Sequence, residues 1–505
     1  MRRRLTAVGD TRAGRLSCAL LCAASLSGVL SQAARAELPP IKHVFVIVLE
    51  NEAESTSFGA ASPAPYLAKT LPSEGAFIPN YYGIGHNSLD NYIAMISGQA
   101  PNEQTRADCT TYSEIPGEEK LLEGEQEPAP GCVYPENVPT LPEQLEERGL
   151  MWRSYDESMG AEPARESATC GHPALNTEDK TEAATEKDQY ATRHNPFMYF
   201  KSIIEHPGIC DTDVVNLEVL PGDLKEAKTT ASYTFITPDL CDDGHDTPCK
   251  DGKRPGGLVS ANAFLEKWVP KITESPAYAE GGLLIVTFDE GENDSSSCCG
   301  EKRGPNAPLP GGNGPGGGDV GAVLLSPYIA PCTVSSVAYN HYSMLGSVEE
   351  FFKLPRLGYA AGTTPFGSDI FTKYPSLVSP APTCYVPPVT QPNPTPTPTP
   401  TPKSTAPACI ATVLPRNPRG TLKANKVFTG VAVQHAGGAA KLILTAVHTG
   451  QLKIVVHPAK GRARTVASRK LAACTGYTFK LPSGHGKLTI VATVGHASET
   501  ATLKY

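Results

Sequence analysis

The sequence predicts a large α/β domain with a mainly parallel sheet, followed by a small all-β domain. Continuous apolar runs, HVFVIVLE at 43–50 and LLIVTF at 283–288, are typical of strands buried on both faces of a sheet. Helical patterns at 92–98, 140–149, 258–272 and 342–354 alternate with such runs, and alternation of this kind favours a parallel sheet. Short β-rich runs separated by glycine-containing turns follow a Thr-Pro repeat, which predicts a separate β domain.

The first 36 residues predict a signal peptide. Three consecutive arginines, Arg2 to Arg4, precede a short apolar run, and the small-residue pattern Ala34-Arg35-Ala36 closes it. We expect cleavage after Ala36 and therefore a secreted, cell-surface or periplasmic protein. No later stretch of the sequence approaches the ~20 apolar residues that a membrane span requires.

Twelve cysteines follow this segment, ten before the Thr-Pro repeat and two after it. Exported proteins meet an oxidising environment in which disulfides persist. The even number on each side predicts disulfides within each domain, and their spacing leaves the pairing open. A zinc site is the weaker alternative, because no C-x-x-C pair with matching histidines is present.

The Thr/Pro-rich segment 385–408 is expected to be an extended spacer between a domain at 37–384 and a domain at 409–505. Residues 37–402 contain 23 Lys and Arg against 50 Asp and Glu, whereas 409–505 contain 14 against one. The basic C-terminal domain, expected to be an Ig-like β-sandwich, suits contact with an anionic cell-wall polymer or membrane surface. An inert basic surface is the alternative. Nucleic acid is not expected as a partner, because aromatic residues that stack on bases are scarce there.

Oxygen-bearing side chains directly follow two of the predicted strands. Glu50 and Asn51 end the first run, and Asp289 and Glu290 end the other. The carboxyl ends of parallel strands meet at one edge of a sheet, where ligands bind. Buried carboxylates are costly without a cation, and one divalent ion of calcium, magnesium, manganese or zinc would remove that cost. The alternative is that these acids are solvated loop residues.

The stretch HNSLDNY at 86–92 places Ser88 before an apolar helical pattern. A serine hydroxyl needs a base or a metal to become an effective nucleophile. A helix that begins near Leu89 would also favour an anion at its first amides. Together these features indicate phosphate as the group that Ser88 attacks.

Five stretches in order resemble one known family. They are HVFVIVLEN (43–51), NYYGIGHNSLDNYIAMISG (80–98), FITPDLCDDGHD (235–246), LLIVTFDEGEND (283–294), and GGGDVGAVLLSPYI (316–329) with YNHYSMLGSVEEFF (339–352). In these stretches the sequence resembles the bacterial phosphoesterases that include secreted acid phosphatases and phospholipases C, in the alkaline-phosphatase-like superfamily. The resemblance spans about residues 40–360 and implies an alkaline-phosphatase-like sandwich with a mainly parallel central sheet.

The resemblance also implies roles for individual residues. Ser88 matches the nucleophile, Asn91 matches an amide that holds phosphoryl oxygens, and three histidines lie in motifs near the phosphate, one of which protonates the leaving group. The implied metal ligands are Glu50, Asn51, Ser88, Asp289 and Glu290, and the three histidines are His86, His245 and His341.

The resulting hypothesis is a secreted, metal-dependent phosphoesterase that forms a phosphoserine and acts most like an acid phosphatase. Asp90 stands where the family usually has a proline, and ENEAESTSF at 50–58 departs from the Glu-Asn-Arg-Ser-Phe-Asp of the longer phospholipase branch. The alternatives are a phospholipase C acting on phosphodiesters and a non-catalytic cell-surface protein on the same fold. The acid-rich inserts 113–131 and 175–189 predict surface loops, and the Gly/Pro-rich run 304–319 predicts a flap or a connector. The oligomeric state is left open.

Overall fold

The computed structural model describes residues 38–374 and the strands that lie between Arg419 and Lys504. The chain divides into two compact units, Met1–Gln391 and Pro392–Tyr505, and each is described by itself. The predicted signal peptide and Thr/Pro-rich spacer lie outside the described residues. None of the helices in the described parts combines the length and apolar character needed to span a bilayer.

An eight-stranded sheet forms the centre of the first unit, in the order β5-β4-β6-β1-β7-β8-β2-β9. From β5 to β7 all neighbouring strands are parallel, whereas β8 runs antiparallel to both β7 and β2. The prediction of an α/β domain with a mainly parallel sheet is confirmed. The strands are β1 (His43–Leu49), β2 (Ala76–Ile78), β4 (Trp152–Asp156), β5 (Val214–Asn216), β6 (Tyr233–Thr237), β7 (Gly282–Phe288), β8 (Ala322–Leu325) and β9 (Thr333–Val334). A separate parallel pair joins β3 (Tyr81–Tyr82) to β10 (Tyr339–Asn340).

The two strands predicted from continuous apolar runs lie side by side in the middle of the sheet. β1 and β7 pair in register from His43 with Gly282 to Leu49 with Phe288, and every residue of both strands is buried. Strands covered on both faces cannot alternate polar and apolar residues, which explains their uninterrupted hydrophobic sequences. Glu50 and Asp289 therefore leave the sheet next to each other.

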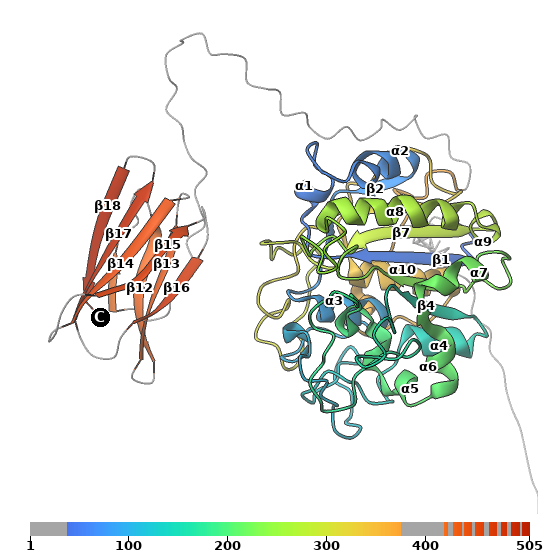
Figure 1. The fold of residues 1–505 in the computed structure, drawn as a ribbon, viewed down its shortest axis with the longest axis horizontal. Coiled ribbons are helices and arrows are strands. Elements are labelled where there is room, and N and C mark those ends of the chain that lie inside the picture. The colour runs from blue at the N-terminus through green and yellow to red at the C-terminus, as the bar shows by residue number, and fades with distance from the viewer. Residues whose placement is uncertain are drawn as a thin grey trace, which may run out of the picture. The chain divides into compact units, whose positions relative to one another are not determined.

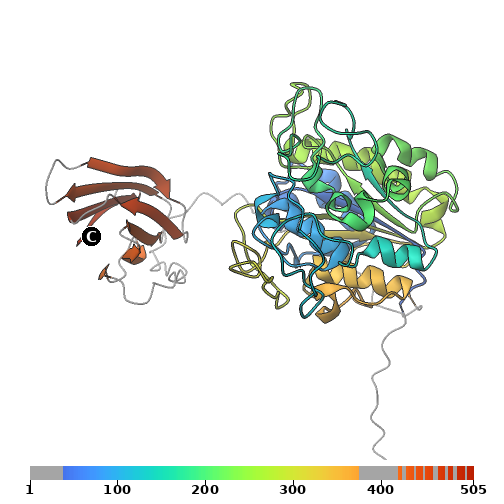
Figure 2. The same cartoon turned by 90° about the horizontal axis from the view of Figure 1, so that it is seen from below.

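Helices cover both faces of this sheet (Figure 1). The main ones are α3 (Ser88–Ser97), α4 (Leu141–Glu147), α8 (Gly257–Thr273) and α10 (His341–Phe352), close to their predicted ranges. The orange helix α10 lies on the opposite side of the sheet from the green helix α8 (Figure 2). Local sequence explains where two of them begin: Thr140 and Glu143 form a capping box at α4, and the Asn340 side chain accepts the Ser343 amide at α10.

Shorter helical segments complete the first unit. They are α1 (Glu54–Ser57), η1 (Tyr66–Thr70), α2 (Leu71–Glu74), η2 (Thr105–Ala107), η3 (Thr192–His194), η4 (Pro196–Tyr199), α5 (Lys201–Ile204), α6 (Pro207–Asp213), η5 (Leu217–Val219), α7 (Leu220–Asp223), α9 (Pro276–Ala279) and η6 (Gly358–Gly362).

The acid-rich inserts are loops, as predicted, and most of their residues are exposed or partly exposed, but a few polar side chains are buried. Gln126 and Glu127 are buried in the first insert, and Asp179, Thr181 and Asp188 are buried in the second. Their polar groups bond within the fold: the Gln126 side chain, for example, accepts the Ala100 amide at 2.7 Å. Hydrogen bonds to distant segments allow these few polar side chains to be buried.

Disulfides form within the first unit, as predicted, and four of them have both cysteines among the described residues. The pairs are Cys109–Cys132, Cys170–Cys210, Cys241–Cys249 and Cys298–Cys299, and Cys332 is also disulfide-bonded.

The second unit contains two four-stranded antiparallel sheets, in the orders β11-β12-β13-β16 and β15-β14-β17-β18. The strands are β11 (Arg419–Leu422), β12 (Phe428–Ala436), β13 (Ala439–Ala446), β14 (Gly450–Pro458), β15 (Arg464–Leu471), β16 (Gly476–Leu481), β17 (Gly486–Val494) and β18 (Ala497–Lys504). Its Ig-like character stays a prediction.

Candidate active site

Glu50 and Asp289 meet at the carboxyl edge of the parallel strands, where the sequence predicts a site. Each is the first residue after its strand, and both are buried. The Asn51 amide donates to Oδ1 of Asp289 at 2.9 Å, which links the ends of β1 and β7. The structure thus brings together acids that are 239 positions apart in the sequence.

Ser88 is the first residue of α3, and its hydroxyl points at Glu50. Oγ of Ser88 donates to Oε2 of Glu50 at 2.7 Å, and the Asn51 side-chain amide donates to the same oxygen at 2.9 Å. The Tyr92 hydroxyl donates to Oε1 of Glu50 at 2.6 Å. Three side chains therefore hold one buried carboxylate beside the predicted nucleophile.

Two asparagines of the site have backbone angles that most residues avoid. The φ angles are 59° at Asn51 and 87° at Asn87. Asparagine tolerates positive φ better than other non-glycine residues, and such strained positions gather at functional sites. These two turns aim the Glu50 and Ser88 side chains at each other.

Glu290 faces the loop before α3. Both of its carboxylate oxygens accept the Asn87 amide, at 3.1 and 3.2 Å, and the carboxylate also pairs with the His86 ring. The other ring nitrogen of His86 contacts the Asp294 carbonyl. Burial lowers the pKa of His86, but Glu290 raises it to a net increase. His86 is therefore held as a partner of Glu290.

The Gly/Pro-rich run 304–319 lies against this same loop. The His86 amide donates to the Gly311 carbonyl at 3.3 Å, and the Gly317 amide donates to the Gly83 carbonyl at 3.1 Å. A Cβ on Gly317 would lie 2.4 Å from the Gly85 carbonyl oxygen, so glycine is required for this approach. The run therefore packs on the loop that presents Ser88.

The other two predicted histidines lie in different environments. His341 is fully buried, with Nε2 2.6 Å from the Asp289 carbonyl oxygen and Nδ1 3.2 Å from the Tyr81 hydroxyl, and burial lowers its pKa to about 4. His245 is about half exposed and lies 3.3 Å from Asp246, whose hydrogen bond raises the pKa of His245 to about 9. Of these two, His245 is the accessible proton donor.

The Asn91 side chain holds the loop that precedes Ser88. Its Oδ1 accepts the amides of Ile84 and Gly85, at 2.7 and 3.0 Å, and its Nδ2 donates to the carbonyls of Gly85 and Asn87, at 3.0 and 3.1 Å. The amide is fully buried. In this structure Asn91 positions the loop, whereas the family resemblance implies contact with phosphoryl oxygens.

The first amides of α3 bind carboxylates, as the helix start predicts, but these carboxylates are side chains of the protein itself. Leu89 donates its amide to Oδ1 of Asp108 at 3.1 Å, and the Asn87 side chain donates to Oδ2 of Asp108 at 3.2 Å. Asp108 and Glu290 together thus occupy the amino-terminal end of the helix.

A further histidine that the sequence did not predict also reaches the site. His194, at the end of η3, has Nε2 3.4 Å from Oε2 of Glu50 and Nδ1 3.9 Å from Oδ2 of Asp243. Its ring stacks on Tyr92 with centroids 5.4 Å apart, and burial together with the charge of Arg193 lowers the pKa of His194. A polar Arg-His pair inside the buried aromatic run at 190–200 is the sequence signal that could have identified it.

The buried acids of the site raise one another's pKa values. Burial and the charge of Asp289 raise the pKa of Glu50, and burial and the charge of Glu290 raise that of Asp289. Burial and the charge of Glu50 likewise raise the pKa of Asp243. Among the described residues, Oδ2 of Asp289 and Oδ2 of Asp243 are buried without a hydrogen-bond partner. This set of buried oxygen donors fits a hard divalent cation.

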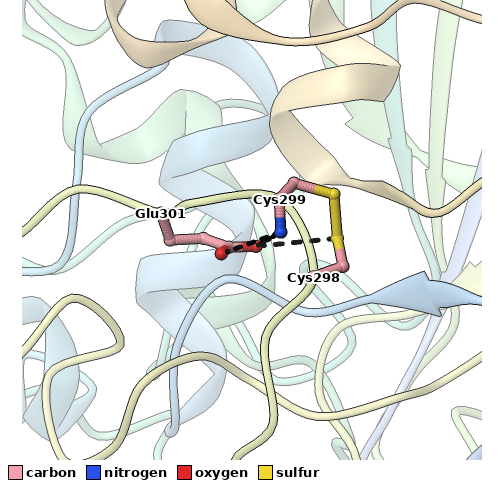
Figure 3. A group of neighbouring side chains, drawn as sticks. All are labelled: Cys298, Cys299 and Glu301. Carbon is pink, nitrogen blue, oxygen red and sulfur yellow. Dashed lines mark hydrogen bonds between the residues drawn. A yellow bond between two sulfur atoms is a disulfide. The ribbon is translucent and has the colours of Figure 1, made fainter.

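Within the described part of the chain, two other groups of potential metal ligands occur, and disulfides occupy their cysteines. Cys298 and Cys299 bond to each other beside Glu301, whose carboxylate accepts the Cys299 amide at 3.2 Å (Figure 3). The second group is Asp239, Cys241 and Asp242, and Cys241 is bonded to Cys249. A cysteine in a disulfide has no thiolate to offer a metal.

The fold and site define an α/β protein with a serine at a helix start facing buried carboxylates at the carboxyl edge of its sheet. The comparisons with known proteins agree with this class. A sequence model of the Phosphoesterase family matches residues 62–355, more than half of the chain, and the chain belongs to that family.

Curated relatives include phosphatases. A probable acid phosphatase of Kluyveromyces lactis is 25% identical over 339 residues, covering 66% of this chain and 64% of the relative. A phosphate-repressible acid phosphatase of Penicillium chrysogenum is 24% identical, covering 60% and 58%. A phosphatidylinositol-3-phosphatase of Mycobacterium tuberculosis is 22% identical, covering 70% and 90%. The chain thus spans less than two thirds of the length of the two fungal relatives.

Solved structures show a more distant likeness. A Vibrio parahaemolyticus protein in the alkaline phosphatase superfamily is 11% identical with a TM-score of 0.37, covering 63% of this chain and 68% of that chain.

Proposed function

We propose that this protein is a secreted phosphoesterase that hydrolyses phosphate esters through Ser88, on an alkaline-phosphatase-like fold. The observation that carries the proposal is the 2.7 Å hydrogen bond from Ser88 Oγ to the buried Glu50, at the start of α3. Membership of the Phosphoesterase family supports it. The signal peptide predicted at residues 1–36 supports export.

The proposed cation site consists of Glu50, Asn51, Ser88, Asp289 and Glu290. Their oxygens suit calcium, magnesium, manganese or zinc, and the buried Oδ2 of Asp289 lacks a partner within the described part of the chain. A bound divalent ion would lower the pKa of a serine hydroxyl and offset the charge of a phosphoryl group.

The protein's own residues supply the remaining chemistry. The Ser88 proton leaves along its hydrogen bond to Oε2 of Glu50 while Oγ forms a bond to phosphorus and the bond to the leaving oxygen breaks. His245 gives its proton to that leaving oxygen, because it is accessible and Asp246 keeps it protonated. Water then attacks the phosphoserine and gives a proton to His245, while the Ser88 oxygen leaves and takes its proton back from Glu50 as phosphate is released.

Phosphomonoesters are the proposed substrates. The relatives named as acid phosphatases support this choice. The alternative is hydrolysis of phosphodiesters, as in a phospholipase C, and a comparison of monoester and diester substrates distinguishes these two activities.

The test is hydrolysis of matched chromogenic monoester and diester substrates by the oxidised protein and its Ser88→Ala variant, with and without chelator. We expect monoester turnover that chelator abolishes and that falls on the order of a thousandfold or more in Ser88→Ala. Unchanged circular dichroism would show that the variant is folded. Substantial turnover by a folded Ser88→Ala variant would contradict the nucleophile assignment.

A further inference from the structure

A phosphoryl group needs hydrogen-bond donors, and the donors expected to bind it already bond to other groups of the protein. Both donors and the acceptor of the Asn91 amide bond to the loop at 84–87. The Leu89 amide bonds to Asp108, and the Asn87 amide bonds to Glu290. These donors are therefore not free in this structure to bind the substrate's oxygens.

Arg193 has free donors beside the site. It precedes His194, whose ring lies 3.4 Å from Glu50, and its side chain is 13% exposed. Nη1 of Arg193 donates to the Glu182 carbonyl at 2.8 Å and lies 3.6 Å from the Glu182 carboxylate. Within residues 38–374 this is the hydrogen bond that the guanidinium makes, so Nε and Nη2 stay available to a ligand.

The charge of Arg193 interacts with acids of the same site. Burial lowers its pKa, but the negative charges of Asp108, Glu182 and Glu50 raise it to a net increase, so Arg193 is permanently protonated. Asp108 in turn accepts hydrogen bonds from Asn87 and Leu89, the two residues that flank Ser88. The guanidinium thus lies among acids that surround the nucleophile.

We propose that Arg193 binds the phosphoryl group of a phosphomonoester through Nε and Nη2 and favours the dianionic monoester over the singly charged diester. This inference rests on the proposed function of Ser88. A guanidinium matches two phosphoryl oxygens in a planar, bidentate geometry, and its charge-assisted bonds are stronger in a site shielded from water. A diester has one negative charge fewer and one terminal oxygen fewer than a monoester. Its binding should therefore weaken less when the guanidinium is removed.

The test compares Arg193→Gln, Arg193→Lys and a matched control, Arg165→Gln. Like Arg193, Arg165 donates hydrogen bonds to backbone carbonyls of the 175–189 insert, namely those of Asp188, Lys180 and Ala183. The readouts are KM and kcat for matched monoester and diester substrates, and inorganic phosphate binding by calorimetry. Thermal melting reports folding.

We expect Arg193→Gln to weaken phosphate binding and raise the monoester KM about ten- to hundredfold, with a much smaller change for the diester. The effect of Arg193→Lys should lie between those of the wild type and Arg193→Gln, because lysine keeps the charge but lacks the two parallel N–H donors of a guanidinium. Arg193→Lys also serves as the test if Arg193→Gln does not fold. Arg165→Gln should lower the melting temperature and leave phosphate affinity unchanged.

Three results would overturn the proposal: equal losses for monoester and diester, unchanged phosphate affinity in a folded Arg193 variant, or the same affinity loss in Arg165→Gln. Failure of the proposed function is distinguishable, because it appears as no Ser88-dependent turnover in the wild-type protein. Phosphate calorimetry requires no turnover and tests Arg193 in either case.

Discussion

Glu50 shows how one buried residue organises the site. Ser88, Asn51 and Tyr92 all donate hydrogen bonds to its carboxylate, and His194 lies 3.4 Å away. A buried carboxylate is strongly destabilising unless donors or a cation surround it. The same donors that make burial of Glu50 tolerable also hold Ser88 in one direction.

Asp156 gives a residue-scale prediction about pH and stability. It is fully buried at the end of β4, it accepts the Ser154 hydroxyl at 2.9 Å, and burial raises its pKa to about 8. The folded protein therefore binds a proton that the unfolded chain releases near pH 4, so stability falls as pH rises from about 4 to 8. The limiting slope is about 1.4 kcal/mol per pH unit.

Asp156→Asn removes this titration while keeping the size of the side chain. We expect the variant to gain stability over the wild type as pH rises from 4 to 8, in urea unfolding at pH 4, 6 and 8. Glu118→Gln, at an exposed position, is the control and should follow the wild-type profile. Parallel stability profiles for Asp156→Asn and wild type would contradict the buried-acid interpretation.

At the scale of elements, α3 is held at both ends. Its start is bonded to Asp108 and Glu290, and its end turns at Gly98, which packs against the segment after α10. The Tyr359 amide donates to the Gly98 carbonyl at 3.0 Å. The position of Ser88 thus depends on contacts at the far end of its helix.

Gly98→Ala tests this end of the helix. The φ angle of Gly98 is 68°, and a Cβ there would lie 2.6 Å from the Leu357 carbonyl oxygen. Gly149 has a φ of 66° and no atom within 4 Å of its Cβ position, so Gly149→Ala is the matched control. We expect Gly149→Ala to cost about 1 kcal/mol in denaturant unfolding and Gly98→Ala to cost clearly more, because strain and a backbone clash add. Equal costs would show that α3 and the segment after α10 adjust freely.

At the scale of the whole molecule, the first unit concentrates negative charge in its interior. Glu50, Asp289 and Asp243 are all buried, and the pKa of each is raised. Mutual repulsion of this kind destabilises a fold unless a cation binds. A metal ion is therefore expected to act on stability as well as on activity.

Thermal melting with and without added divalent ions measures this effect. An ion that binds only the folded state, at a hundred times its dissociation constant, stabilises by about 2.7 kcal/mol, and the melting temperature should rise accordingly. Asp289→Asn should remove most of that rise, whereas Asp179→Asn, a buried acid of the second insert, should keep it. The same rise in Asp289→Asn and wild type would place the cation elsewhere.

Local sequence was sufficient for much of the fold and part of the site. Uninterrupted apolar runs predicted β1 and β7, and the carboxylates that follow them were correctly expected at one edge of the sheet. The helix start at Ser88 was also predictable, because a polar loop precedes an apolar helical pattern. The acid-rich inserts form the predicted loops, but composition did not reveal which of their polar side chains become buried.

What the sequence by itself determined is the alternation of strands and helices and the chemical groups available at the strand ends, since both follow from short-range patterns. Only the tertiary structure decided which of those groups are free: it committed Asn91 to its own loop, turned Glu290 towards His86, and brought His194 and Arg193 to Glu50. The physical reason is that these hydrogen bonds and charge environments exist only after the chain has folded, and the partners of Glu290 and His194 come from segments more than a hundred residues away in the sequence.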